Sequence, residues 1–204
     1  MKKLYLLFII PCCLFAGSLD DYLKEAGQNV SEGHCYSKRS SQPDFFRNLL
    51  SENPQIAVIG EIGFNAGHSS ELFLESSETT EVYSFDIMEH EYAYYGKKYI
   101  DEHFPLRHTL VEGDSRESVP VFAAKHPDLK FDLMFIDGGH FFQVALADII
   151  NLARFAHDSS ILIIDDIDNI QVRRAWQEGV RRGIITRGRI VKDGRREWVV
   201  CHYR

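Results

Sequence analysis

Short apolar runs alternate with amphipathic stretches through most of the chain. The apolar runs are rich in β-branched and aromatic residues and predict strands at Gln55–Ile59, Glu81–Phe85, His108–Val111, Phe131–Ile136 and Ser160–Ile164. The stretches between and after them predict helices at Ser69–Glu75, Glu89–His103, Ser115–Lys125, Phe142–Phe155 and Gln171–Arg182. This alternation predicts βαβ units, and therefore an α/β fold with a doubly wound parallel sheet and helices on both faces.

The C-terminal segment predicts a different arrangement. Ile184–Val191 and Arg196–His202 flank the sequence Lys192-Asp193-Gly194-Arg195. Asp-Gly between two strands favours a tight turn, so we expect an antiparallel hairpin with this dipeptide at its turn.

The first 54 residues divide into two parts. Lys2 and Lys3 precede an apolar run, Leu4–Phe15, and the small residues Ala16-Gly17-Ser18 follow it. This order predicts a signal peptide or hydrophobic leader at residues 1–18, and with it an exported or membrane-associated protein. The alternative is a buried N-terminal helix in a cytoplasmic protein. Residues 19–54 predict a helical extension, with helices near Leu19–Ala26 and Pro43–Leu50, ahead of a domain at residues 55–204.

Composition and charge narrow the range of partners. The chain has 204 residues, 45% of them hydrophobic, which is enough for a sizeable core. Its net charge of −7 argues against a nucleic-acid partner. Residues 171–204 are nonetheless basic, which fits either a solvated helix and hairpin or a docking face for an acidic substrate or anionic lipid. After removal of a leader, Cys35 and Cys201 would remain, either paired or as two free thiols.

A glycine-rich bend follows the first predicted strand, in the sequence Val58-Ile59-Gly60-Glu61-Ile62-Gly63-Phe64-Asn65-Ala66-Gly67-His68-Ser69-Ser70. Gly63 and Gly67 permit positive φ and close approach of a ligand to the backbone. The dinucleotide pattern G-x-G-x-x-G counted from Gly60 fails, because Ile62 and Asn65 stand where glycines are needed. Glu61 would suit a ligand that carries an ammonium group.

Acidic residues follow the next two strands. Asp86 ends the second strand, where a carboxylate can accept both hydrogen bonds of a ribose diol, although a strand-end cap is the alternative. Asp114 and Ser115 follow the third strand and could reach an adenine amino group or cap the next helix.

The landmarks Glu61-Ile62-Gly63-x-Asn65-x-Gly67-x-Ser69, Asp86, Gly113-Asp114-Ser115 and Phe135-Ile136-Asp137-Gly138-Gly139-His140 resemble class I S-adenosylmethionine-dependent methyltransferases, specifically methyltransferase family 24. The resemblance covers roughly residues 55–202. It implies a Rossmann-like seven-stranded sheet, mostly parallel, with an antiparallel strand in the C-terminal hairpin. It also implies cofactor-binding roles, with Glu61, Gly63, Asn65 and Gly67 on the methionine side, Asp86 at the ribose, and Asp114 with Ser115 at the adenine.

Candidate catalytic groups follow the fourth and fifth strands. Asp137 and His140 lie at the first tip, and Asp165 with Asp166 at the second. The arrangement resembles divalent-metal O-methyltransferases of the catechol type, which implies Asp137, Asp165 and Asp166 as ligands for Mg²⁺ or a similar hard cation. Histidine is a competent base near neutral pH, so His140 is a candidate to deprotonate a hydroxyl. The alternatives are that Asp165-Asp166 caps a loop and that Asp137 orders backbone amides or binds cofactor.

We therefore expect an enzyme that transfers a methyl group from S-adenosylmethionine to a small-molecule hydroxyl, with or without assistance from Mg²⁺. The alternative is an exported, non-catalytic ligand-binding or interaction module that keeps the same fold. No pattern in the sequence identifies the methyl acceptor or the oligomeric state.

Overall fold

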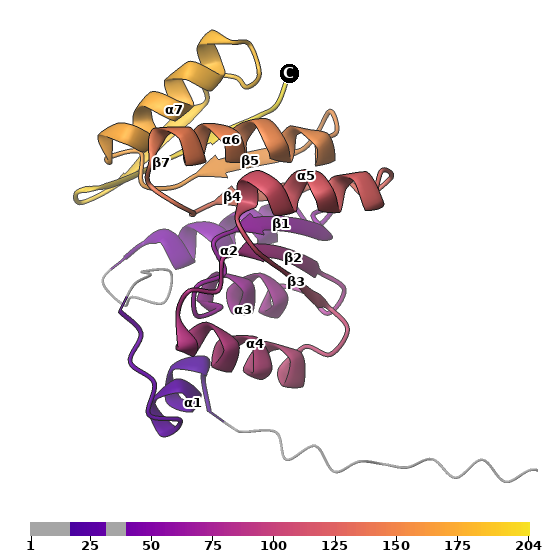
Figure 1. The fold of residues 1–204 in the computed structure, drawn as a ribbon, viewed down its shortest axis with the longest axis vertical. Helices are drawn as coiled ribbons and strands as arrows, with labels where there is room; N and C mark the ends of the chain where they lie inside the picture. Colours follow the sequence, from indigo (N-terminus) through magenta and orange to yellow (C-terminus); the bar gives the residue numbers. More distant parts are fainter. Residues whose placement is uncertain (1–16, 32–39) are drawn as a thin grey trace, which may run out of the picture.

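A seven-stranded sheet in the order β3-β2-β1-β4-β5-β7-β6 runs through the centre of the molecule (Figure 1). The computed structural model describes residues 17–31 and 40–204. The strands are β1 (Val58–Ile62), β2 (Glu81–Asp86), β3 (His108–Glu112), β4 (Leu133–Ile136), β5 (Ile161–Ile164), β6 (Arg189–Asp193) and β7 (Arg196–Cys201). The helices are α1 (Leu19–Glu25), α2 (Gln42–Glu52), α3 (His68–Glu75), α4 (Glu91–His103), α5 (Ser115–Lys125), α6 (Phe142–Leu152), the 3₁₀ helix η1 (Ala153–Phe155) and α7 (Ile170–Arg181).

The order of the strands reverses between β1 and β4. The chain winds outward through β1, β2 and β3, and then crosses back to place β4 parallel to β1, with β5 parallel to β4. β7 pairs with β5 and β6 in antiparallel fashion. In open α/β sheets, ligands bind beyond the carboxyl ends of the strands at such a reversal. The predicted fold class is confirmed, and it brings the glycine bend and the acids of β2, β4 and β5 to one edge.

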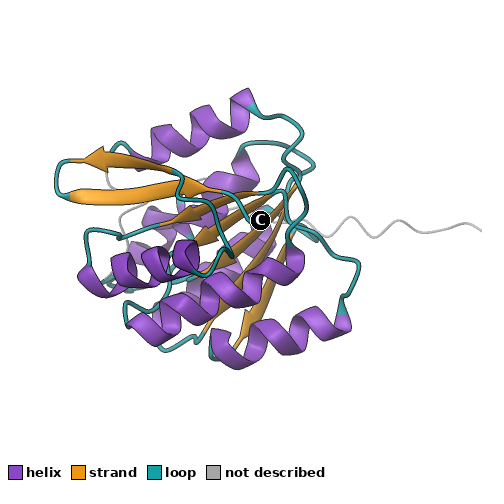
Figure 2. Cartoon of the chain, turned by 90° about the horizontal axis from the view of Figure 1, so that it is seen from above, coloured by secondary structure: helices purple, strands orange, loops and turns teal. Residues whose placement is uncertain are grey.

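Helices lie on both faces of the sheet (Figure 2), and a hydrophobic layer on each face holds them there. Helices α1 to α4 bury apolar side chains on one face, and α5, α6 and α7 cover the other. On the first face, the ring of Phe46 in α2 packs edge-on against Phe73 and Phe135, each with ring centroids 5.0 Å apart. Helix α2 is therefore fixed to the centre of the sheet, because Phe135 lies in β4.

The predicted bounds of the first strand are wrong. Gln55–Ile59 was expected, but a turn closed by the Ile56 amide and the Asn53 carbonyl occupies its start. Both the Ala57 and Val58 amides donate to the carboxylate of Asp132 at 2.9 Å, and β1 begins at Val58. The strand consequently includes Gly60 and Glu61, so Glu61 lies within the sheet instead of in the loop.

The C-terminal hairpin is confirmed, but its first strand and its turn are displaced. β6 begins at Arg189, whereas Ile185 forms only an isolated bridge with Tyr203. Asp193 pairs with Arg196, so the two-residue turn consists of Gly194 and Arg195, with a φ of 61° at Gly194. Glycine at the first central position is typical of a type II′ turn, whose twist suits a hairpin.

The predicted leader at residues 1–18 lies almost wholly outside the described residues, and Cys35 lies wholly outside them. Cys201 is buried and forms no disulfide with another described residue. Ser18 caps helix α1, accepting a hydrogen bond from the Asp21 amide. Within the described part of the chain, every helix is too short or too polar to cross a bilayer. Export, membrane association and the cysteine pairing stay predictions.

Candidate active site

The bend between β1 and α3 is built on left-handed backbone. Gly63 has a φ of 97°, and a Cβ atom there would lie 2.1 Å from the carbonyl oxygen of Asp137. Gly67 has a φ of 94°, and a Cβ atom there would lie 2.8 Å from the ring of Phe64. Gly63 thus lets the bend lie directly against the β4 tip, and Gly67 lets it lie against the ring of Phe64, which belongs to the bend.

Asp86 ties the bend to the tip of β2. Its carboxylate accepts hydrogen bonds from the amides of Asn65, at 2.8 Å, and Met88, at 2.6 Å. Asn65 itself has a φ of 50°, and its buried side-chain oxygen has no hydrogen-bond partner among the described residues. A buried acceptor without a donor is costly, so this oxygen fits a ligand that brings an N–H or O–H group.

Glu61 is fully buried between β1, α3 and β2. Its carboxylate accepts hydrogen bonds from three hydroxyls, those of Ser69, Ser70 at 2.6 Å and Ser84 at 2.7 Å. Burial raises the pKa of Glu61, although the three hydroxyls oppose the rise. The structure therefore places this carboxylate among hydroxyls below the bend, and its proposed contact with an ammonium group stays a prediction.

Asp114 and Ser115 occupy the start of α5. Asp114 caps the helix by accepting from the Arg116 amide at 2.9 Å, and hydrogen bonds from Arg116 lower the pKa of Asp114 to about 2. The hydroxyl of Ser115 donates to Asp148 at 2.6 Å. Both residues stand beyond the β3 tip, as expected, while the capping role anticipated as the alternative for Asp114 is confirmed.

Asp148 is a buried acid that the sequence did not indicate as part of the site. One carboxylate oxygen accepts from Ser115, and the other has no hydrogen-bond partner among the described residues. The second oxygen would lie 3.4 Å from a Cβ atom at Gly138, so Asp148 sits directly under the loop after β4. Burial raises the pKa of Asp148 to about 7.

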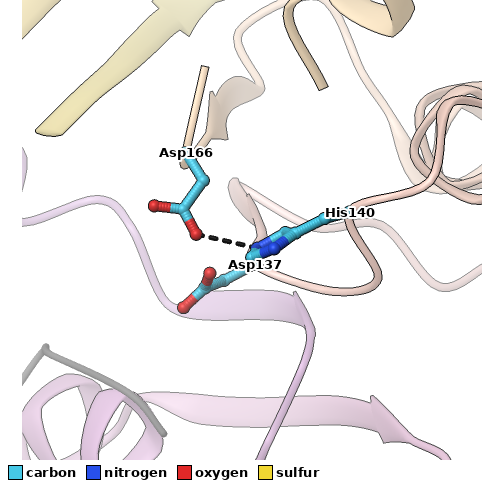
Figure 3. A group of neighbouring side chains, drawn as sticks. All are labelled: Asp137, His140 and Asp166. Carbon is cyan, nitrogen blue, oxygen red and sulfur yellow. Dashed lines mark ion pairs between the residues drawn. The ribbon is translucent and has the colours of Figure 1, made fainter. Parts of the chain in front are cut away.

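Asp137, His140 and Asp166 converge at the tips of β4 and β5 (Figure 3). One potential ligand atom from each side chain lies within 4.8 Å of the others. The Nε2 atom of His140 is 2.9 Å from a carboxylate oxygen of Asp166. Burial, together with the charges of Asp165 and Asp166, raises the pKa of Asp137 well above its ordinary value. A small pocket opens over these residues, with Ala145 and Val172 in its wall.

Asp165 does not join this convergence. Its carboxylate accepts from Gln42 at 2.7 Å, from Arg196 at 2.8 Å and from the Asp166 amide at 2.8 Å. The oxygen and nitrogen donors of Asp137, His140 and Asp166 fit a divalent cation, because carboxylate and imidazole are common ligands of such ions. Asp165 is less suited to bind a metal ion, since its carboxylate already accepts hydrogen bonds from three protein donors.

Comparisons with known proteins agree with this fold. Residues 61–167, more than half of the chain, match methyltransferase family 24, described as a methyltransferase domain. The chain belongs to this family. No curated protein matched the sequence.

Solved structures share the fold at low sequence identity. The O-methyltransferase from Bacillus cereus in complex with S-adenosylhomocysteine is 17% identical, with a TM-score of 0.74 and 94% of both chains covered. The S-adenosylhomocysteine-bound methyltransferase PaMTH1 of Podospora anserina is 12% identical, with a TM-score of 0.70 and coverage of 91% of this chain and 87% of that one. CalS11, a TDP-rhamnose 3′-O-methyltransferase of calicheamicin biosynthesis, is 20% identical, with a TM-score of 0.62 and coverage of 89% and 90%. These likenesses establish a Rossmann-like methyltransferase fold.

Proposed function

We propose that this protein transfers a methyl group from S-adenosylmethionine to a hydroxyl oxygen of a small-molecule acceptor. The observation that carries the proposal is the convergence of His140, Asp166 and Asp137 beside the glycine bend. The family supports methyl transfer, and two of the similar structures bind S-adenosylhomocysteine, the product that S-adenosylmethionine leaves behind.

The cofactor would lie along the edge from the glycine bend to α5. When bound, S-adenosylmethionine supplies an electrophilic methyl group on a sulfonium sulfur. The unpartnered oxygen of Asn65 would accept a hydrogen bond from the amino-acid end. Gly63 and Gly67 would allow close backbone contact, Asp86 would bind the ribose, and Asp114 with Ser115 would border the adenine.

The acceptor would lie over β4 and β5, where His140 and Asp166 meet. A hydroxyl becomes a better nucleophile as its proton leaves, and the His140–Asp166 pair would receive that proton. Asp166 orients the imidazole through the 2.9 Å contact. Holding the oxygen in line with the methyl group contributes to the rate by positioning alone.

A divalent cation such as Mg²⁺ would fit between Asp137, His140 and Asp166, and His140 would then be a ligand instead of the base. When bound, it would lower the pKa of a coordinated hydroxyl. The raised pKa of Asp137, caused by burial and neighbouring carboxylates, supports the idea that this cluster is more stable with a positive charge beside it.

Calorimetry with S-adenosylmethionine and S-adenosylhomocysteine tests the proposal, with Asn65→Ala as the variant at the bend and Asp158→Asn as a remote control. We expect the wild-type protein and the control to bind both nucleosides, and Asn65→Ala to bind them more weakly. Release of S-adenosylhomocysteine in the presence of a hydroxyl-compound library would then identify the acceptor. A folded protein that binds neither nucleoside at millimolar concentration would instead be a non-catalytic module.

A further inference from the structure

The carboxylate of Asp165, at the β5 tip, accepts three hydrogen bonds. One oxygen accepts the amide hydrogen of Asp166 at 2.8 Å. The other accepts from the side chains of Gln42, at 2.7 Å, and Arg196, at 2.8 Å. The side chain of Asp165 is 0% exposed, so these three donors stand in place of water.

Asp166, the next residue, has an unusual backbone conformation. Its φ of 51° lies in the left-handed region, where a residue with a Cβ atom is disfavoured. This conformation accompanies the orientation of the Asp166 carboxylate toward His140 (Figure 3). Strained residues of this kind persist where neighbouring groups fix them, and the hydrogen bond that the Asp166 amide donates to the Asp165 carboxylate is such a constraint.

The donors that hold Asp165 come from distant parts of the chain. Gln42 begins α2 and is 1% exposed, and the amide of the preceding Ser41 donates to Asp193 in the hairpin at 2.6 Å. Arg196 begins β7, and its guanidinium also lies 3.7 Å from Asp166. The start of α2, the tip of β5 and the C-terminal hairpin therefore meet at Asp165.

We propose that Asp165 is a positioning residue: clamped by Gln42 and Arg196, it holds Asp166 in the backbone conformation that presents its carboxylate to His140. Helix α2 is consequently part of the acceptor side of the site. The conformation of Asp166 does not depend on the proposed function. Only the chemical role of the His140–Asp166 pair rests on that function.

Nuclear magnetic resonance of the Asp166 amide tests the proposal without any substrate. In the wild-type protein, the hydrogen bond to a carboxylate should shift this amide proton downfield and slow its exchange with water. Asp165→Ala should remove the downfield shift and raise the exchange rate at least tenfold. Gln42→Leu, a milder change that keeps the carboxylate, should produce a smaller change of the same sign. Asp158→Ala, an exposed residue at the opposite end of β5, is the matched control and should leave the signal unchanged.

If the chemical shift and exchange rate of the Asp166 amide proton were unchanged in folded Asp165→Ala, the proposal would be overturned. That result is independent of calorimetry with S-adenosylmethionine, which tests the proposed function and should be insensitive to Asp165. The two failures are therefore distinguishable.

Titration with Co²⁺ alone separates a positioning residue from a metal ligand. Loss of a group that supports a ligand typically lowers metal affinity about 10–100-fold. Asp165→Asn should weaken Co²⁺ binding within that range and leave the visible absorption spectrum of the bound ion intact. Asp166→Asn should alter the spectrum itself. Equal changes of the spectrum in both variants would assign Asp165 as a ligand and overturn the proposal, and if Co²⁺ does not bind, the amide measurement decides.

Discussion

The imidazole Nε2 of His140 lies 2.9 Å from the carboxylate of Asp166, although the two residues follow different strands. β4 and β5 are parallel neighbours in the sheet, with Ile136 in register with Ile164, so their following loops leave the sheet side by side. The contact places a carboxylate–imidazole pair at the carboxyl ends of β4 and β5, close to where the bend after β1 meets Asp137.

We expect His140→Gln and Asp166→Asn to lower the rate of methyl transfer by about 10²–10⁴-fold, the usual contribution of general acid–base catalysis. The affinity for S-adenosylmethionine should change little, because neither residue lies at the glycine bend. Formation of S-adenosylhomocysteine with the identified acceptor measures the rate, and calorimetry measures the affinity. Asp158→Asn serves as the control for aspartate replacement. Full activity in His140→Gln would rule out this residue as the base.

Gly63→Ala should destabilise the protein and remove cofactor binding. The new methyl group would meet the Asp137 carbonyl oxygen at 2.1 Å, in a backbone with a φ of 97°. We expect the free energy of unfolding to fall by roughly 3 kcal/mol, combining overpacking with left-handed strain. Urea unfolding gives this value.

Gly183→Ala separates the effect of left-handed backbone strain from that of the steric clash with the Asp137 carbonyl. Gly183 has a φ of 71°, but a Cβ atom there has no neighbour within 4 Å. This variant should lose only about 1–2 kcal/mol of unfolding free energy and retain cofactor binding. Equal losses in the two variants would show that close packing against the β4 tip is unimportant.

The general position of the site followed from sequence because it depends on local patterns. Apolar runs specify parallel strands, and residues at their carboxyl ends must share an edge. Asp137, Asp165 and Asp166 were therefore expected together at the tips of β4 and β5, with Asp86 at the same edge of the sheet, and Asp165 is the one that does not join the cluster. The bounds of β1 were not predictable in the same way, because the start of the strand is fixed by the Asp132 carboxylate, far along the chain.

The groups that hold Asp165 could not be inferred from sequence. Gln42 belongs to a polar helix without a motif, and Arg196 appeared as one of many basic residues near the C-terminus. Their roles arise from long-range packing: α2 is anchored through Phe46, and the hairpin is paired to β5. The place of Asp148 could not be inferred either, since its position below Gly138 depends on how α6 packs on the sheet.

Removal of divalent cations should reduce methyl transfer if the Asp137, His140 and Asp166 cluster holds a metal. We expect activity to fall after dialysis against a chelator and to return with Mg²⁺ or Mn²⁺, because the cation would offset the neighbouring carboxylates. His140→Gln should shift the concentration of Mn²⁺ needed for half-maximal thermal stabilisation, whereas Asp158→Asn should not. Undiminished activity after exhaustive chelation would favour the His140–Asp166 pair acting alone.

Asp148 should make the stability of the protein depend on pH. Burial raises the pKa of Asp148 from an ordinary value of 3.8 to about 7 in the folded state. Between these values, the folded protein retains a proton that the unfolded chain has released. The contribution of Asp148 to the free energy of unfolding is therefore largest below about pH 4. It decreases as the pH rises toward 7 and is constant above that pH.

Asp148→Asn tests this prediction because asparagine can still accept the hydrogen bond from Ser115 and carries no charge. Each unit of raised pKa corresponds to about 1.4 kcal/mol, so the variant should gain a few kcal/mol relative to wild type when unfolding is measured at pH 8 instead of pH 5. Urea unfolding at both pH values, compared with Asp158→Asn, isolates the effect of Asp148 from other ionisable groups. A difference between wild type and Asp148→Asn that is the same at pH 5 and pH 8 would show that Asp148 is ionised in the folded protein at both, and that its second oxygen has a partner.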